Sequence, residues 1–192
     1  PEAFAAVDRI AAALGVEREI VVPGAQEARA AAYLITAAEG AALHLDRLRR
    51  RPSDFDPAVR DRLLAGAMLP AESIVKAHEF RAWFRARTAE IFAEVDIVLA
   101  PATPCRAPLS GQKLMNLDGA DVSVRANLGI YTQPISFIGL PVATVPVFTD
   151  GERLPIGVQI IGPAWREDLV LRVAHDLESR AVVSAPLASL AG

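Results

Sequence analysis

Residues 141–161, which read PVATVPVFTDGERLPIGVQII, determine the architecture that this sequence predicts. Pro141–Val147 is rich in β-branched residues and predicts a strand, and Pro146 near its end favours an edge or a bulge. Pro155–Ile161 alternates isoleucine and valine with other residues, which is typical of a second strand. Thr149–Glu152 predicts the turn between them, so the two strands should pair as a hairpin.

Helices flank this hairpin in the sequence on both sides. Downstream, Arg166–Arg180 predicts a closing helix with Glu167 and Asp168 in its first turn, where acidic residues complement the helix dipole. Its inward face should carry the apolar residues Leu169, Val173, Ala174 and Leu177. The tail, Ala181–Gly192, has no such pattern and is expected to be loosely held.

The segment just upstream changes in character. Asp96–Ala100 is a short apolar run that predicts a strand buried on both faces. Residues 101–121 carry three prolines and two glycines and predict a long loop, a feature that is usually functional in a compact domain. Val124–Phe137 is mixed in character and suggests a helix.

The first hundred residues are mainly helical by pattern. A helix over residues 1–15 should end at Gly15, and a longer one over 25–50 should place Leu34, Ala38, Ala41, Leu45 and Leu48 along one apolar stripe. Asp56-Pro57 is typical of a helix start, and another helix is expected over 71–94. Glu19–Val22 is a candidate strand. Helices that alternate with few strands indicate an α/β or α+β layering.

Composition excludes several classes of protein. The 192 residues carry a net charge of -3 at a pI of about 5.7, which argues against a general nucleic-acid binder. No apolar run reaches the length of a membrane span, and the start does not resemble a signal peptide. The chain begins without Met, which suggests a truncated or processed start. Its single cysteine, Cys105, permits no internal disulfide, and a cytoplasmic location is expected.

A search for local catalytic signatures finds none. The sequence has no G-x-S-x-G elbow, no Ser-Ser pair in a glycine-rich loop and no glycine-rich phosphate loop. The histidines His44, His78 and His175 lack partners at metal-ligand spacing, so we expect no metal. For Cys105 two interpretations stay open: a thiol activated by Arg106, or a small loop residue.

Three segments together resemble the C-terminal half of amidase-signature enzymes. They are Tyr33–Ala42 with Leu45 and Arg47, then Val59–Pro104, and most specifically Thr132–Pro141 followed by Val145-Pro146 and Leu154–Gly162. Their order and spacing agree over nearly the whole chain. The resemblance implies a mixed sheet flanked by helices, within an α/β fold that is incomplete on its own. Residues 1–192 would then be the C-terminal part of an amidase domain.

Within that family, residues 125–137 look most like carboxybiuret hydrolases of s-triazine (cyanuric acid) breakdown. Phe55-Asp56-Pro57 and Leu69-Pro70-Ala71 point the same way. Allophanate-type hydrolases, the amidase subunit of glutaminyl-tRNA amidotransferase and general amidases are the related interpretations. The implied activity is hydrolysis of an amide C–N bond with release of ammonia.

The resemblance implies a Ser–cis-Ser–Lys mechanism whose residues lie in the N-terminal half of the family's fold. Neither Lys76 nor Lys113 matches the motif of the family's lysine, so no catalytic residue is assigned to this chain. The 192-residue chain alone is expected to be inactive. No cofactor is implied.

The part of the family's fold that this chain resembles supplies one wall of the substrate pocket. The residues that correspond to it here are Arg125, Asn127, Tyr131, Thr132 and Gln133. Gly129 stands where amidotransferase-type members carry an Asp, which disfavours recognition of a free amino group. Arg125 suits a carboxylate, because a guanidinium binds one through two hydrogen bonds; a surface salt bridge is the alternative for this residue.

A second hypothesis is a non-catalytic module derived from the amidase fold, which binds a small acid or a protein partner. The expected partners of an amidase are a small amide substrate and the missing N-terminal half. Further partners that the family implies are a homodimer and a small helical subunit. Neither a nucleic acid nor a membrane is expected as a partner.

Overall fold

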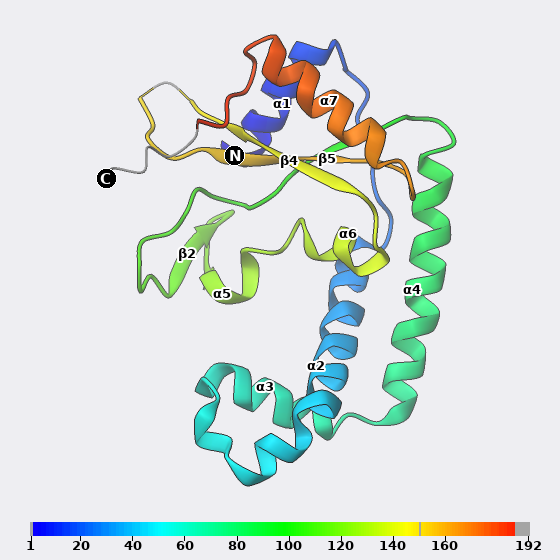
Figure 1. Cartoon of the computed structure of the whole chain (residues 1–192), viewed down its shortest axis with the longest axis vertical. Helices are drawn as coiled ribbons and strands as arrows, with labels where there is room; N and C mark the ends of the chain where they lie inside the picture. The colour runs from blue at the N-terminus through cyan, green and yellow to red at the C-terminus, as the bar shows by residue number, and fades with distance from the viewer. Residues whose placement is uncertain (1, 150, 187–192) are drawn as a thin grey trace. The chain divides into compact units, whose positions relative to one another are not determined.

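The computed structural model describes residues 2–149 and 151–186 and divides into two compact units (Figure 1). The first combines Pro1–Val21 with Ala89–Gly192 and contains the β-strands, so we call it the sheet unit. The second, Val22–Thr88, consists of helices, and we call it the helical unit.

The predicted hairpin forms the centre of the sheet unit. Strands β4 (Val142–Val147) and β5 (Ile156–Ile161) pair antiparallel, with Val145 opposite Val158. On its other side β5 pairs antiparallel with β1 (Val98–Pro101), which gives the order β1-β5-β4. Pro146 therefore lies in an edge strand, where its missing N–H costs no internal ladder bond, as the sequence predicted.

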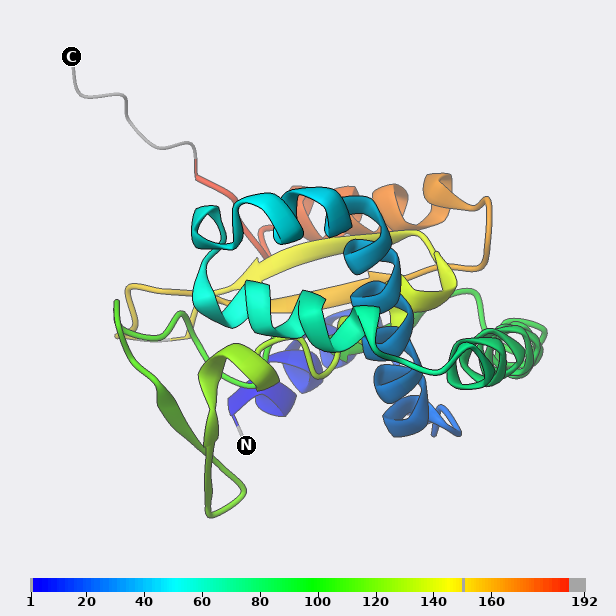
Figure 2. The same ribbon diagram turned by 90° about the horizontal axis from the view of Figure 1, so that it is seen from below.

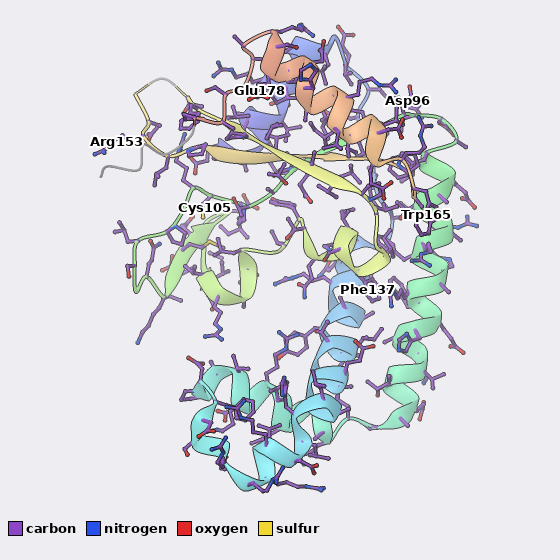
Figure 3. The ribbon with its side chains drawn as sticks, viewed as in Figure 1. Asp96, Cys105, Phe137, Arg153, Trp165 and Glu178 are labelled. Atoms are coloured by element: carbon purple, nitrogen blue, oxygen red, sulfur yellow. The ribbon has the colours of Figure 1, made fainter. Side chains whose placement is uncertain are left out.

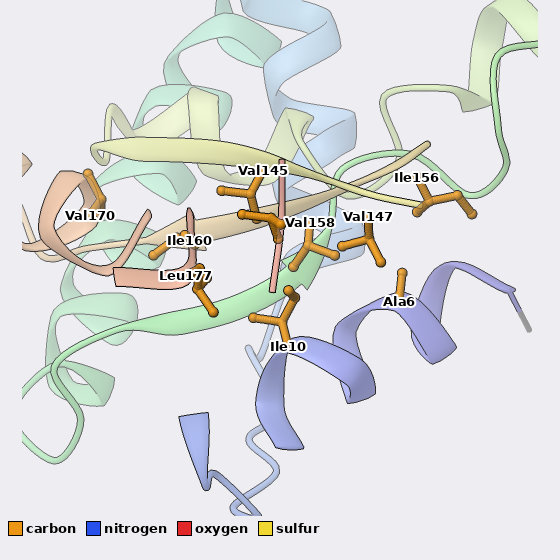
Figure 4. Packing of buried hydrophobic residues seen from close by; sticks show 10 residues of the cluster. Ala6, Ile10, Val145, Val147, Ile156, Val158, Ile160, Val170 and Leu177 are labelled. Carbon is orange, nitrogen blue, oxygen red and sulfur yellow. The ribbon is translucent and has the colours of Figure 1, made fainter. Parts of the chain in front are cut away.

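Two helices cover one face of this sheet (Figure 1). Helix α1 (Glu2–Leu14) contacts β1 and β5, while α7 (Glu167–Ser179) contacts β4 and β5. Side chains at alternate strand positions meet the two helices in one buried cluster (Figure 4). Its members are Ala6, Ile10, Val145, Val147, Ile156, Val158, Ile160, Val170, Leu177 and Val183.

The inward face of α7 differs in part from the prediction, and that of α1 consists mainly of small residues. In α1 the buried residues are Ala3, Ala6 and Ile10, whereas Phe4 is exposed. In α7 Leu177 is buried and Val173 and Ala174 pack against the core cluster, as predicted, but Val170 is buried where Leu169 was expected. The small alanines of α1 allow its backbone to lie close to the sheet. The residues of α1 that are buried are therefore those where helix and sheet approach most closely, and these are not its largest side chains.

The segment over residues 101–121, expected to be a loop, contains regular structure. β2 (Leu114–Leu117) and β3 (Ala120–Ser123) pair antiparallel as a separate hairpin (Figure 2). Asp118 and Gly119 form its two-residue turn, both with positive φ of 51° and 86°. An Asp-Gly pair is a strong hairpin signal, and the prolines and glycines nearby masked it.

Other element boundaries shift or disappear. The candidate strand Glu19–Val22 is wrong, because residues 16–22 form no strand and Val21 is exposed. β1 begins two residues later than predicted. The mixed segment 124–137 resolves into two short helices, α5 (Val124–Asn127) and α6 (Gln133–Ile138), joined by a turn.

The helical unit is formed by α2 (Ala25–Arg50), a 3₁₀ turn (η1, Pro52–Asp54), α3 (Pro57–Ala67) and most of α4 (Ala71–Ile91). Asp56 caps α3, as predicted, by accepting hydrogen bonds from the backbone N–H of Ala58 and Val59. Helices α2 and α3 pack closely on each other. On α2 the predicted Ala41 and Leu48 are buried and Leu34, Ala38 and Leu45 are half-buried, while the buried face also extends to Ala31, Ile35 and Ala37.

The tail and the fold class complete the comparison with the sequence. Val183 is buried in the core cluster, so the start of the tail Ala181–Gly192 is held by packing. Residues 187–192 lie outside the described residues, as do Pro1 of the first predicted helix and Asp150 of the predicted turn. The α/β class is confirmed, and the strand pairs of the described residues are antiparallel. None of the described helices has the length and apolarity needed to cross a membrane.

Candidate functional site

The segment that carries the five candidate substrate residues begins at the end of the β2–β3 hairpin. Ser123, the last residue of β3, caps α5 by accepting a hydrogen bond from Ala126 N at 3.4 Å. Val124 N donates to Lys113 O at 3.0 Å, which continues the ladder of the hairpin into the helix. Val124 is also buried, so α5 starts from a fixed point.

A compact turn connects α5 to α6. Ile130 N donates to Asn127 O at 3.2 Å, and Gln133 N donates to Gly129 O at 2.9 Å. Ser136 N donates to Thr132 O at 3.0 Å and closes the first turn of α6. The backbone of the whole segment is therefore ordered by its own hydrogen bonds, as a binding loop requires if it is to be pre-formed.

The structure places the five candidate residues on this one segment, in different environments. Asn127 Nδ2 donates back to Ser123 O at 2.9 Å, and Thr132 Oγ1 lies 3.5 Å from Gly129 O. Arg125 is exposed. Gln133 is half-buried and begins α6.

Tyr131 is held by an aromatic contact with α1. Its ring meets that of Phe4 edge to face, with 5.8 Å between centroids and 82° between planes. Burial raises the pKa of the Tyr131 phenol, and the charge of Asp118 raises it further. The contact with α1 accounts for the exposed Phe4, whose ring serves Tyr131 rather than the core.

Gln159 contacts the backbone of this segment and was not among the predicted residues. It lies in β5 on the face opposite the α1–α7 core, and only 2% of its surface is exposed. Its Nε2 donates to Pro101 O at 2.7 Å and to Tyr131 O at 3.3 Å. The signal in the sequence was a lone amide between Val158 and Ile160, in a strand that is otherwise buried and apolar.

The surroundings of Cys105 disfavour its thiolate. The guanidinium of Arg106 donates to Leu154 O at 3.0 Å and to Thr149 Oγ1 at 2.5 Å, and pairs with Glu2. Cys105 Sγ lies 3.6 Å from Met115 Sδ, at the base of the β2–β3 hairpin (Figure 3). Burial raises the pKa of the thiol, and Glu2 raises it further. The small-residue interpretation of Cys105 is therefore the better one.

Other groups with catalytic potential have structural partners. The hydroxyls of Ser136 and Ser179 donate to backbone carbonyls of their own helices, and Lys76 Nζ pairs with Glu72 at 2.5 Å. In the part of the chain that the structure describes, no three His, Cys, Asp or Glu side chains gather closely enough to hold a metal ion.

Comparison with known proteins gives a consistent family. The family model described as Amidase matches residues 3–171. AtzE, a 1-carboxybiuret hydrolase subunit of Pseudomonas sp. (strain ADP), is 40% identical over 183 residues, which are 95% of this chain and 40% of that protein. One subunit of the glutamyl-tRNA(Gln) amidotransferase of Novosphingobium aromaticivorans is 34% identical over 153 residues, or 77% of this chain and 30% of that protein.

Solved structures agree with these relatives. One is an inhibitor-bound complex, described as an unexpected vestigial protein complex that reveals the origins of an s-triazine catabolic enzyme. It matches with a TM-score of 0.93 and 39% identity over 97% of this chain and 41% of that chain. A crystal structure of an amidase matches with a TM-score of 0.84 and 28% identity, covering 93% and 41%. This chain thus spans about two fifths of the length of these proteins.

Proposed function

This chain belongs to the amidase family, and we propose that it is part of an amide hydrolase that cleaves a biuret-type substrate and releases ammonia. The observation that carries the proposal is the 40% identity to a 1-carboxybiuret hydrolase subunit over 95% of the chain. We call residues 123–133, which carry the five candidate residues, the substrate wall. The backbone of this segment is ordered by its own hydrogen bonds.

We place catalysis outside this chain. A Ser–cis-Ser–Lys mechanism needs a nucleophilic serine, a relay serine and a neutral lysine. Lys76 is paired with Glu72, and neither it nor Lys113 fits that role. The chain alone should therefore be inactive, and its contribution is to bind and orient the substrate.

The chemistry of the wall suits an acidic, amide-rich substrate. A carboxybiuret carries one carboxylate and several N–H and C=O groups. Arg125 offers a guanidinium for the carboxylate, while Asn127, Thr132 and Gln133 offer donors and acceptors for the amides. Tyr131 provides a neutral phenol, as any tyrosine does at neutral pH, and burial raises its pKa further.

An amidotransferase amidase subunit is the second candidate, supported by relatives such as the 34% identical amidotransferase protein. Gly129 is against it, since no side chain is present there to bind a free amino group. The vestigial complex among the similar structures supports a protein partner, for which we propose a small helical subunit beside the rest of the amidase. A homodimer and a cytoplasmic location complete the proposal.

Replacing Arg125 tests the carboxylate assignment. In the polypeptide that carries this sequence and hydrolyses the amide, Arg125→Leu should raise KM for carboxybiuret by about ten- to a hundredfold, because a charged hydrogen-bonded pair contributes about 1.5–3 kcal/mol. Arg125→Lys should recover part of the loss, since it keeps the charge without the planar fork. Steady-state ammonia release measures both.

The control for Arg125 is an uncharged substrate. The KM for biuret, which lacks the carboxylate, should change by less than about threefold in either variant if Arg125 binds that group. Equal losses on both substrates would show that Arg125 has a structural role, and the carboxylate assignment would be abandoned.

A further inference from the structure

The amide of Gln159 is unusual for its position. β5 is the central strand of the sheet, and Gln159 is opposite Ala100 in β1 and Thr144 in β4. Among the described residues the buried polar side chains are Gln159 and Thr88, and Thr88 merely bonds to Phe84 O in its own helix. Burying an amide is costly unless its polar atoms are bonded, so its presence in β5 needs an explanation.

Its hydrogen bonds supply that explanation. Both hydrogens of the Gln159 amide nitrogen are used, by the carbonyls of Pro101 and Tyr131. These two acceptors are 30 residues apart in sequence, and one ends β1 while the other precedes α6. Two carbonyl oxygens around one atom require an –NH2 group there, which fixes the orientation of the amide.

Tyr131 is thereby held from two directions. Gln159 binds its backbone oxygen, and Phe4 of α1 packs on its ring. The next two residues, Thr132 and Gln133, follow directly in the chain and open α6. A shift of the Tyr131 carbonyl would move both of them with it.

From this geometry we infer that Gln159 is a positioning residue for the substrate wall, acting through the backbone of Tyr131 without touching the substrate. The effect on substrate binding rests on the proposed function, whereas the hydrogen bonds of Gln159 do not. An apolar residue would suffice for the packing of the sheet. The amide instead joins the turn before α6 to the end of β1 through its two hydrogen bonds, which together we call the tie. Loss of the tie should loosen substrate binding more than it slows chemistry.

Two substitutions separate the hydrogen bonds from the shape of the side chain. Gln159→Met keeps the length but leaves both carbonyls without a donor at every pH. Gln159→Glu keeps the length and, when neutral, one O–H donor. Burial and two facing oxygens should raise the pKa of this new carboxyl, so it donates at low pH and repels both carbonyls at high pH. Because the neutral carboxyl has one O–H for two carbonyls, the tie in Gln159→Glu should be partly kept at low pH and lost as pH rises through that raised pKa.

The experiment uses the polypeptide that carries this sequence and its ammonia-release activity. We expect KM of Gln159→Glu relative to wild type to rise about tenfold between about pH 5.5 and 8.5, with kcat within about threefold. Gln159→Met should show the raised relative KM at every pH. Hydrogen exchange at the amides of Gln133 and Ser136, relative to wild type at the same pH, should be faster in both variants. The excess should grow with pH in Gln159→Glu and be present at every pH in Gln159→Met.

Val158→Ala is the matched control, since it is fully buried in the same strand but faces the α1–α7 core. It should lower stability without changing KM or the exchange at Gln133 and Ser136. The inference is overturned if Gln159→Glu shows no more exchange there than this control, or if exchange rises while KM stays constant. A wild type that hydrolyses no amide would instead remove the proposed function and with it the substrate role, while the exchange data still judge the tie itself.

Discussion

Gly66→Ala is expected to destabilise the helical unit by about 2–3 kcal/mol, the upper part of the range for overpacking. In most helices the same change stabilises by about 1 kcal/mol, because alanine is the better helix former. Here a Cβ at position 66 would lie 2.2 Å from the backbone oxygen of Ala37 and 2.5 Å from its carbonyl carbon. Backbone atoms of α2 cannot rotate away, so α2 and α3 must separate.

Gly40→Ala is a matched control for this effect. It introduces the same methyl group at the same pair of helices, but the nearest atom is Cδ2 of Leu63, at 2.7 Å. The end of a leucine side chain can turn away, so the steric cost of the added methyl group should be close to the gain from alanine's higher helix propensity. The net change in the free energy of unfolding should stay within about 1 kcal/mol. Urea unfolding followed by circular dichroism at the helix band measures both. Equal losses would mean that α2 and α3 do not approach as closely as described.

Ile160→Ala is expected to lower the stability of the sheet unit by about 2–5 kcal/mol. Ile160 lies in the central strand, has no exposed surface and belongs to the cluster formed with α1 and α7. Truncation removes three carbons from a fully buried site packed between the sheet and two helices. The cost therefore combines the lost transfer free energy with that of a cavity.

The control is Leu171→Ala, on the exposed side of α7, where 63% of the residue's surface is accessible. It should change the free energy of unfolding by less than about 0.5 kcal/mol. The two variants are compared by urea denaturation followed by tryptophan fluorescence. A loss at Ile160 no larger than that at Leu171 would contradict the placement of the core.

The sequence predicted the elements whose signals are local and strong. The β4–β5 hairpin, the cap at Asp56 and the end of α1 at Gly15 follow from alternation, capping chemistry and a glycine with positive φ. The β2–β3 hairpin was missed although Asp118-Gly119 signals it, because its strands have four residues each and follow a proline-rich stretch that ends at Pro108. Residues 19–22 have strand propensity without a partner strand, and propensity alone does not form a sheet.

The candidate site was predictable only in part. Its five residues were assigned through family resemblance, and their contact with substrate stays a prediction. Gln159 was missed because its role depends on two carbonyls brought together by the fold, from β1 and from the turn before α6. Local patterns report propensity and amphipathicity, and neither reports which backbone groups a buried amide will meet.

The most direct measurement is ammonia release from 1-carboxybiuret, with biuret and simple amides beside it, by purified protein whose intact mass is known. We expect release only from a species larger than the 20.5 kDa of this chain, with carboxybiuret preferred. Hydrolysis by the 20.5 kDa chain itself would contradict the account, because it would require a nucleophile and base within these 192 residues.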